Sequence, residues 1–236
     1  MIPAYNEEKR LPGSLEAVTG YLAKSAPRFR EVIVVDDGSS DGTAGVVERF
    51  AASHGEVRLL KNPGNRGKGF SVRHGMLEAR GDWVLFSDAD LSAPIEEVAR
   101  LEAAASAGGA AVAIGSRALD RSLIGIHQSV FREYAGRVFN LAMRLLTGLP
   151  FWDTQCGFKL FRRDAAQQVF RRQQIERFGF DAEVLFIARL LKYRIVEVPV
   201  RWSHSEGTKV SMTADSLTMF ADLFRIRRNQ LLGKYR

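Results

Sequence analysis

Cysteine, histidine and long apolar runs are all scarce in this chain of 236 residues. Its single cysteine, Cys156, cannot form a disulfide within the chain, which excludes the disulfide-stapled secreted scaffolds. The four histidines lack the spacing of zinc ligands, so we expect no structural zinc site. No stretch approaches the ~20 apolar residues that a membrane-spanning helix needs. The sequence starts with neither the basic region nor the apolar core of a secretory signal, and we therefore expect a cytoplasmic protein.

The rest of the composition is that of a folded globular protein, with 46% hydrophobic and 26% charged residues. The charge is distributed unevenly along the chain. Residues 117–177 contain 11 basic and 5 acidic residues (net +6), and residues 221–236 contain 5 and 1 (net +4), whereas the whole chain carries only +7. A basic second half indicates an anionic partner: nucleic acid, phospholipid or a phosphorylated substrate.

Short apolar runs alternate with longer amphipathic ones. The first half predicts strands at 32–35, 57–60, 83–86 and 111–114, separated by helices at 8–24, 43–53, 70–79 and 95–105. The second half predicts helices at 131–146, 181–191 and 217–231, and a strand at 195–198. This series predicts one α/β domain with a mostly parallel sheet, whose ligand site lies beyond the carboxyl ends of the strands. Residues 2–4 would end a first strand that is unusually short, so we expect the natural protein to start earlier.

Two acidic residues, Asp36 and Asp37, follow the predicted strand 32–35 directly. The residue types in segment 37–48 match those at the ligand positions of a calcium-binding loop. An EF-hand needs a helix before its loop, whereas a strand precedes this one, and calcium binding is therefore disfavoured. We predict instead a strand-to-helix turn whose carboxylates accept hydrogen bonds from a base or ribose. Ser40 or Asp41 would cap the helix that follows.

A second acidic pair, Asp88 and Asp90, follows the predicted strand 83–86. In an extended segment, carboxylates two residues apart point to the same side, so both can approach one hard cation that bridges a diphosphate. Without a cation between them, the two carboxylates would repel each other. The pattern therefore predicts a divalent metal site. Mg²⁺ and Mn²⁺ are equally suitable, because both accept oxygen ligands.

The glycine-rich segment 63–69 (PGNRGKG) invites comparison with a phosphate-binding loop. It fails the Walker template, because Gly69 rather than Ser or Thr follows Lys68, and it contains no G-x-G-x-x-G. A nucleoside triphosphatase is therefore disfavoured. We predict a loop beside the site, with Lys68 near a phosphate.

Several motifs together resemble family-2 glycosyltransferases, which use nucleotide-sugar donors: residues 2–8 (IPAYNEE), 34–43 (VVDDGSSDGT), 88–90 (DAD) and 115–117 (GSR). Residues 153–159 (DTQCGFK) and 197–209 resemble the branch that glycosylates polyprenyl phosphates. Agreement is best with the dolichyl-phosphate β-glucosyltransferases, which 65–69 and 75–81 also support. The resemblance covers essentially the whole chain.

The resemblance implies a single GT-A-like domain with helices on both faces of the sheet and a basic helical C-terminal part. Residues 1–210 would form the transferase domain, in which 1–115 bind the donor and 116–210 the acceptor. Residues 211–236 would form an amphipathic helix. Because Leu217, Phe220 and Phe224 stand beside Arg225, Arg227 and Arg228, this helix would lie on the cytoplasmic membrane surface, or pack on its own domain or a second subunit.

The resemblance also implies the residues of the site. The nucleotide sugar would be held by Pro3, Ala4, Tyr5, Glu7, Asp36, Asp37, Lys68, Asp88, Ala89 and Lys209. Asp88, Asp90 and Ser92 would bind Mg²⁺ or Mn²⁺; mannosyl-transferring relatives have a glutamine where this chain has Ser92, so water would complete the shell. Arg117 and Arg132 would grip the acceptor phosphate and, with Asp88 and Asp90, act in catalysis. Those relatives also have an arginine where this chain has Ser203, a departure that favours glucose as the sugar.

The reaction that the resemblance implies is an inverting transfer of glucose from UDP-glucose to a polyprenyl phosphate. A phosphate monoester has a second pKa of ~6 and is already ionised at neutral pH, so no general base is assigned. One alternative is another donor, either a different UDP-sugar or GDP-mannose. A second is a saccharide acceptor, because 174–178 (QIERF) is faintly similar to a signature of processive synthases. A third is a module that binds a nucleotide sugar without catalysis. Nucleic-acid binding is disfavoured, because acidic clusters at the strand ends would repel its phosphates.

Overall fold

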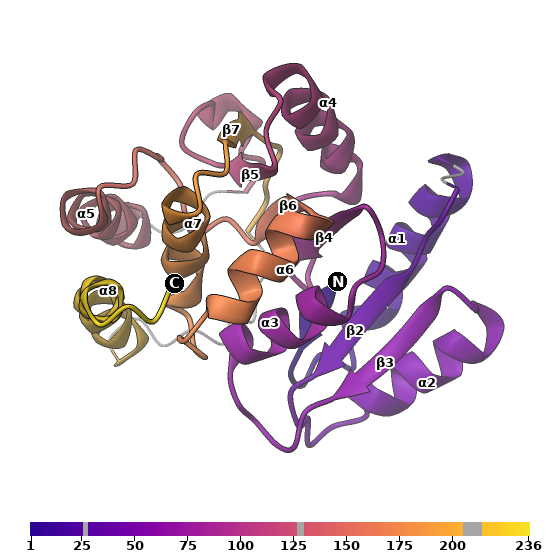
Figure 1. Ribbon diagram of the computed structural model, residues 1–236. Helices are drawn as coiled ribbons and strands as arrows, with labels where there is room; N and C mark the ends of the chain where they lie inside the picture. The colour runs from indigo at the N-terminus through magenta and orange to yellow at the C-terminus, as the bar shows by residue number, and fades with distance from the viewer. Residues whose placement is uncertain (26–27, 127–129, 205–213) are drawn as a thin grey trace.

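The central strands are apolar on both sides because helices cover both faces of the sheet. In β2 (Val32–Asp36), Ile33 and Val35 join the core on one face, whereas Val32 and Val34 join the core on the other. Side chains alternate between the faces of a strand, so an uninterrupted apolar strand must be covered twice. The computed structural model, which describes residues 1–25, 28–126, 130–204 and 214–236, accordingly has a layered α/β architecture (Figure 1).

The strands form two sheets that meet edge to edge. The first has the order β1 (Ile2–Ala4), β2 and β3 (Val57–Lys61), all parallel. The second has the order β4 (Trp83–Ser87), β6 (Phe158–Arg162), β5 (Val112–Ser116) and β7 (Ile195–Pro199), in which β6 alone is antiparallel to its neighbours. The Met1 nitrogen donates to the Leu85 carbonyl (2.7 Å) and the Ser87 nitrogen donates to the Met1 carbonyl (3.0 Å). These bonds join β1 to β4 and bring their carboxyl ends to one edge.

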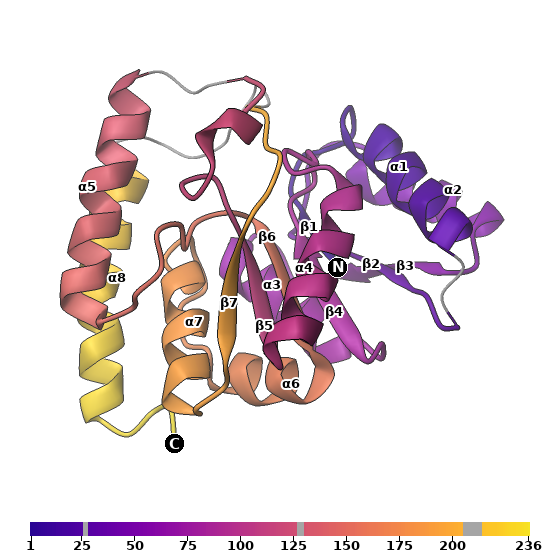
Figure 2. The ribbon, with the colours of Figure 1, turned by 90° about the horizontal axis from the view of Figure 1, so that it is seen from above.

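The helices divide into two layers and a flanking pair. One face is covered by α1 (Leu11–Ser25), α2 (Thr43–Ser53) and α4 (Val98–Gly108), the last of which follows a 3₁₀ turn at Ile95–Glu97. The other face is covered by α3 (Lys68–Glu78), α6 (Arg163–Arg172) and α7 (Phe180–Leu190). Beside α7, α5 (Val130–Thr147) and α8 (Ala214–Leu231) pack against each other at one end of the molecule (Figure 2). A second 3₁₀ turn spans Arg121–Leu123.

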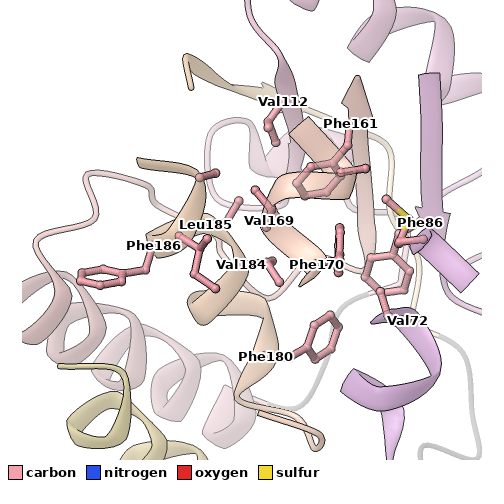
Figure 3. Packing of buried hydrophobic residues seen from close by; sticks show 14 of the residues in the cluster. Val72, Phe86, Val112, Phe161, Val169, Phe170, Phe180, Val184, Leu185 and Phe186 are labelled. Atoms are coloured by element: carbon pink, nitrogen blue, oxygen red, sulfur yellow. The ribbon is translucent and has the colours of Figure 1, made fainter. Parts of the chain in front are cut away.

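The largest core lies between the sheet and the layer of α3, α6 and α7. Its centre is aromatic: the rings of Phe86 and Phe180 pack edge to face with centroids 5.8 Å apart, and those of Phe161 and Phe170 at 5.2 Å (Figure 3). Such pairs stabilise a core beyond the burial of their apolar area.

The expected α/β fold, with a mostly parallel sheet and helices on both faces, is confirmed, and the predicted strands and helices are present. Helix α1 begins at Leu11, three residues later than predicted, and the helix predicted at 95–105 begins with a 3₁₀ turn. The apolar pattern did not predict β6 or α6. Among the described residues, no helix is both long and apolar enough to cross a membrane.

Strand β6 escapes a pattern search because a lysine interrupts its apolar run. Lys159 is 0% exposed, and its ammonium group donates to the Cys156 carbonyl (2.6 Å) and pairs with Asp181 at the start of α7. Burial raises the pKa of the Asp181 carboxyl, which Lys159 opposes. The ion pair therefore holds β6 to α7 while leaving neither charge unpartnered.

We predict that Lys159→Met destabilises the protein by about 3–5 kcal/mol, because the substitution leaves Asp181 buried without its cation. The remaining carboxyl has a raised pKa, so stability is retained below its unfolded pKa of about 3.9 and lost as the pH rises. The deficit relative to the wild type should therefore grow between pH 4 and 8. Urea unfolding checks this, with Lys159→Met/Asp181→Leu expected to recover much of the loss. A single variant as stable as the wild type at pH 8 would contradict it.

Candidate active site

The polar residues singled out in the sequence gather at one edge of the joined sheets. Tyr5 and Glu7 lie in the loop after β1, and Asp36 ends β2 with Asp37 directly after it. Asp88 and Asp90 lie in the loop after β4, and Arg117 follows β5. Pro3 and Ala4 lie in β1 with their backbones paired to β2, and Ala89 is buried against α1, where the Ser14 hydroxyl donates to its carbonyl (2.7 Å). The carboxyl edge predicted as the ligand site is thus where these residues lie.

The first two loops are cross-linked by hydrogen bonds. The Asn6 nitrogen donates to the Ser39 hydroxyl (2.9 Å), and the Ser40 nitrogen donates to the Asn6 side-chain carbonyl (2.8 Å). The Glu7 nitrogen donates to the Thr43 hydroxyl (2.7 Å) at the start of α2. Asn6 adopts φ +53°, a left-handed conformation that asparagine tolerates. These bonds form a fixed rim on which the Tyr5 ring is 36% exposed.

Asp37 organises the glycine-rich loop. One of its carboxylate oxygens accepts hydrogen bonds from the Asn62 amide (2.7 Å) and the Arg66 nitrogen (3.0 Å), and the other accepts from the Gly67 nitrogen (2.7 Å). Asp36, in contrast, accepts a hydrogen bond from the Ser39 nitrogen in its own turn (3.2 Å). Asp37 therefore holds the glycine-rich loop, whereas Asp36 accepts a hydrogen bond within its own turn. The sequence did not predict this role of Asp37.

The segment 173–177 clamps the same loop from the other side. The Phe70 nitrogen donates to the Glu176 carbonyl (3.0 Å), and the Gln173 amide donates to the Gly69 carbonyl (2.8 Å). A Cβ at Gly67 or Gly69 would lie 2.6 Å from a carbonyl oxygen of this segment, so both positions need glycine. Gly67 also adopts φ +107°. The loop thereby fixes the backbone of Lys68, the first residue of α3.

Segment 173–177 is itself anchored by a buried carboxylate. Glu183 accepts hydrogen bonds from the Ile175 nitrogen (2.8 Å), the Gln174 nitrogen (3.1 Å) and the Tyr235 hydroxyl (2.6 Å). Burial raises the pKa of the Glu183 carboxyl, an effect that these donors oppose. Glu183 therefore links the end of the chain to the loop that carries Lys68.

Asp88 lies where β4 meets β6. Its carboxylate pairs with the Lys68 ammonium (2.7 Å), and its nitrogen donates to the Gly157 carbonyl (3.1 Å). A Cβ at Gly157 would lie 2.1 Å from the carboxylate, so the absence of a side chain makes room for it. The segment is not extended as predicted: the Leu91 nitrogen donates to the Asp88 carbonyl (3.2 Å) and Leu91 has φ +46°, which closes a turn over Asp88 and Asp90.

The residues of this turn fit a divalent cation. Asp88 and Asp90 supply carboxylate oxygens, the ligands that Mg²⁺ and Mn²⁺ prefer, and the missing side chain of Gly157 leaves room for the Asp88 carboxylate. Asp90 is oriented by the Ser92 nitrogen, which donates to it (3.0 Å). The described part of the chain contains no group of three His, Cys, Asp or Glu side chains that could hold an ion alone. Further ligands would have to come from Ser92, water or a bound diphosphate.

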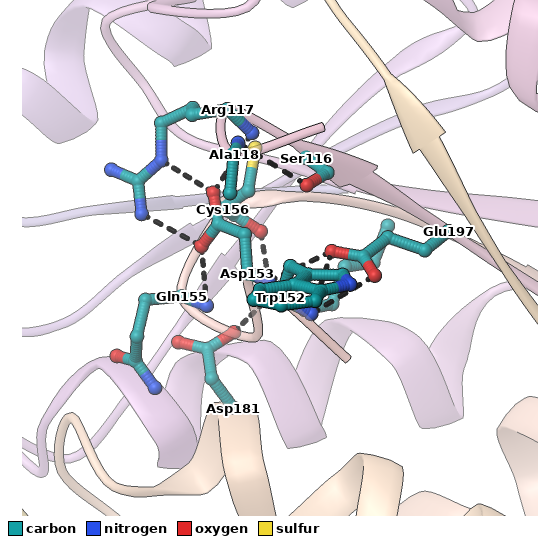
Figure 4. A network of polar contacts seen from close by, with 10 residues as sticks. Ser116, Arg117, Ala118, Trp152, Asp153, Gln155, Cys156, Asp181 and Glu197 are labelled. Carbon is teal, nitrogen blue, oxygen red and sulfur yellow. Dashed lines mark hydrogen bonds and ion pairs between the residues drawn. The ribbon is translucent and has the colours of Figure 1, made fainter. Parts of the chain in front are cut away.

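Arg117 is held by a carboxylate that the sequence reading did not select. Its Nε and Nη2 donate to the two oxygens of Asp153 (2.6 and 2.9 Å), and its backbone nitrogen donates to the same side chain (3.0 Å). Although burial acts in the opposite direction on each group, the pair raises the pKa of Arg117 and lowers that of Asp153. Asp153 is positioned in turn by Glu197, which accepts its backbone N–H (2.7 Å; Figure 4).

The remaining site predictions stay predictions. Arg132 lies in α5, but its side chain is outside the description, and Lys209 lies outside the described residues. Glu7 accepts two hydrogen bonds from Arg10 (2.7 and 2.8 Å).

Burial raises the pKa of Cys156 to about 12, so its thiol stays protonated beside Asp153. The sequence does contain a signal for Asp153 and Lys159, the only two charged residues between positions 145 and 161. Gly157 lies in the same motif, 153–159, which follows a predicted helix.

Comparison with known proteins identifies a family and several relatives. The model of the family described as glycosyl transferase family 2 matches residues 1–170. Over the whole chain and 76% of the relative, the sequence is 42% identical to dolichyl-phosphate β-glucosyltransferase of Drosophila melanogaster and 39% identical to that of Homo sapiens. The Saccharomyces cerevisiae protein of that name is 35% identical, with 75% of its length covered.

Solved structures agree on the fold. The structure is similar to a Mycobacterium tuberculosis glucosyl-3-phosphoglycerate synthase crystallised with Mn²⁺ and UDP-glucose, with a TM-score of 0.65 and 20% identity over 99% of this chain and 77% of that one. It is also similar to mannosyl-3-phosphoglycerate synthase from Rubrobacter xylanophilus, with a TM-score of 0.68 and 22% identity over 99% and 74% of the chains. At these identities the similarity concerns the fold alone.

We predict that Gly157→Ala weakens Mn²⁺ binding by at least about tenfold, because the new methyl group would displace the Asp88 carboxylate. Mn²⁺ titration followed by electron paramagnetic resonance measures this. Gly13→Ala is the matched control, since a Cβ there meets no atom within 4 Å. Equal Mn²⁺ affinity of the two variants would show that Gly157 makes no room for a metal-binding Asp88.

Proposed function

Since the chain belongs to glycosyltransferase family 2, we propose that this glycosyltransferase moves glucose from UDP-glucose to a polyprenyl phosphate of the dolichyl type, giving a β-glucosyl phospholipid. The observation that carries the proposal is similarity along the entire chain to the fly, human and yeast dolichyl-phosphate β-glucosyltransferases. The departure at Ser203 from the mannosyl-transferring pattern favours glucose over mannose.

Residues 1–115 form the donor-binding half in this proposal. The nucleotide lies on the rim made by the loops after β1 and β2, against Tyr5, Glu7 and Asp36, with Lys209 closing over it. Asp88 and Asp90 hold Mg²⁺ or Mn²⁺, which when bound neutralises charge on the leaving diphosphate. Support comes from the hydrogen bonds that fix this rim and from the room that Gly157 leaves for the Asp88 carboxylate.

Residues 116–210 form the acceptor half, in which Arg117 and Arg132 hold the lipid phosphate. Asp153 accepts from Nε and Nη2 of Arg117, so Nη1 and the second hydrogen of Nη2 remain to contact the phosphate. Asp153 and Glu197 are therefore positioning residues. A phosphate oxygen that is already ionised needs no general base, and its attack from the side opposite the diphosphate inverts the α-linked donor. Positioning and electrostatics supply the rate.

The helices α5 and α8 bring the protein to the lipid in this proposal. Residues 211–236 provide the amphipathic helix, and its neighbour α5 adds apolar side chains of its own. Leu217 is 74% exposed on α8 and Leu145 is 76% exposed on α5. Phe224 is exposed beside Arg225, and basic residues next to exposed apolar ones suit an anionic bilayer surface. We place this contact at the cytoplasmic face, as a peripheral association.

A donor screen tests the function. Purified protein with Mg²⁺ or Mn²⁺ and a polyprenyl phosphate in detergent is offered labelled UDP-glucose, UDP-galactose, UDP-N-acetylglucosamine or GDP-mannose. Label should enter the lipid from UDP-glucose and fall at least about a hundredfold in Asp90→Ala and Arg132→Ala, because each substitution removes charge stabilisation from the transition state. The exposed Asp82→Ala and Arg171→Ala are controls. Transfer from another donor, or only to a saccharide, would overturn the assignment.

Membrane association is tested by flotation with vesicles that contain phosphatidylserine. Phe220→Ser/Phe224→Ser should reduce the vesicle-bound fraction at least about tenfold, since each buried aromatic ring contributes about 1.5–3 kcal/mol. Leu119→Ser, an exposed apolar position outside both helices, is the control. If the double variant floats like the wild type, α8 does not make the contact. A change from dimer to monomer in light scattering would assign this face to a second subunit instead.

A further inference from the structure

We propose that Lys68 is an exchangeable internal cation of the donor site. It neutralises Asp88 while no divalent ion is bound, and it moves to the diphosphate when the ion arrives. The inference deepens the proposed function, because it assumes a donor with a metal-bound diphosphate. It does not depend on which sugar or acceptor is used.

The first observation is the contact between the two residues. The Lys68 ammonium lies 2.7 Å from an Asp88 oxygen, so it stands where a cation bound to that oxygen would stand. The side chains are 25% and 32% exposed, so part of the pair faces solvent, although the contacted Asp88 oxygen is itself buried. A carboxylate oxygen in contact with an ammonium group cannot also bind a metal ion at about 2.1 Å in the same direction. A divalent ion on this oxygen must therefore displace the lysine.

The second observation is that the backbone on both sides of Lys68 is held in place by hydrogen bonds. Asp37 holds the nitrogen of Gly67, and the segment 173–177 holds the backbone of Gly69 and Phe70. The ammonium group is carried on a flexible four-carbon stem, so it can exchange partners without a change in the loop. Because Lys68 is the first residue of α3, a diphosphate oxygen near the start of this helix would lie close to it.

The third observation concerns the other positive charges nearby. Lys159 is bound to Asp181 and Arg117 is bound to Asp153, and both of these carboxylates are buried. Neither can turn to Asp88 without leaving a buried carboxylate unpartnered, whereas the Asp88 side chain that Lys68 would leave is 32% exposed. Of these three cations, Lys68 is thus the one that can leave its carboxylate at the lowest cost.

Metal and nucleotide binding should consequently be coupled. In the free protein a metal ion competes with Lys68 for Asp88. When UDP is present, the displaced ammonium group gains the diphosphate as its new partner, so the displacement costs less. Each ligand then raises the affinity for the other by the same factor.

The test compares Mn²⁺ binding in the wild type and Lys68→Met, with and without UDP, by electron paramagnetic resonance and calorimetry. Without UDP, Lys68→Met should bind Mn²⁺ about three- to tenfold more tightly, because a competing charge has been removed. The factor by which UDP raises Mn²⁺ affinity should shrink towards one. Lys68→Arg should retain the coupling, and Lys61→Met, which removes an exposed lysine paired with Glu48, should leave it unchanged.

Unchanged or weaker Mn²⁺ binding by folded Lys68→Met, or undiminished coupling, would overturn the inference, and so would a wild type that binds no Mn²⁺. Circular dichroism shows whether the variant is folded, and Lys68→Gln provides a second neutral variant if it is not. None of these readouts involves glucose transfer. Failure of the donor screen with the Mn²⁺–UDP coupling intact would remove the proposed acceptor and sugar but leave the role of Lys68 standing.

Discussion

The candidate site depends on neutralising several carboxylates that the fold brings to one edge of its sheets. Asp153 is paired with Arg117, Asp181 with Lys159 and Asp88 with Lys68, while Asp37 accepts hydrogen bonds from the glycine-rich loop. Each of these four carboxylates thus has its own donor, as burial requires. The carboxylates differ in exposure: Asp153 and Asp181 are buried and hold their cations in place, whereas Asp88 is 32% exposed and open to a ligand.

Close approach of backbone to backbone and backbone to carboxylate is the second constraint. Gly67 and Gly69 let the glycine-rich loop press against the segment 173–177, and Gly157 lets β6 pass beside Asp88. Close contacts at these glycines therefore join segments that lie far apart in the sequence. From Tyr235 the contacts run through Glu183 to segment 173–177, and from there to the loop that carries Lys68. The end of the chain, next to the helix proposed to meet the membrane, is in this way linked to the proposed donor site.

Much of the fold could be predicted from local patterns, since strands such as 32–35 are apolar throughout and helices such as 131–146 are amphipathic. Strand β6 could not, because its central lysine reads as a surface residue until its partner Asp181 is known. The antiparallel insertion of β6 between β4 and β5 likewise depends on contacts between residues far apart in the chain. For the site, the acidic motifs predicted which loops matter. They did not predict that Asp88 and Asp90 lie on a turn or that Asp37 serves the glycine-rich loop.

The sequence by itself determined the family resemblance, the α/β class and the placing of acidic residues directly after strands. These properties depend on the order and spacing of neighbouring residues, which the sequence gives directly. The tertiary structure alone decided which charges are partners: that Arg117 belongs to Asp153, Lys159 to Asp181 and Lys68 to Asp88. The physical reason is that an ion pair is set by distance in space and by burial, and residues 20 to 36 positions apart, the separations of these three pairs, meet only when the sheets and their helices have packed.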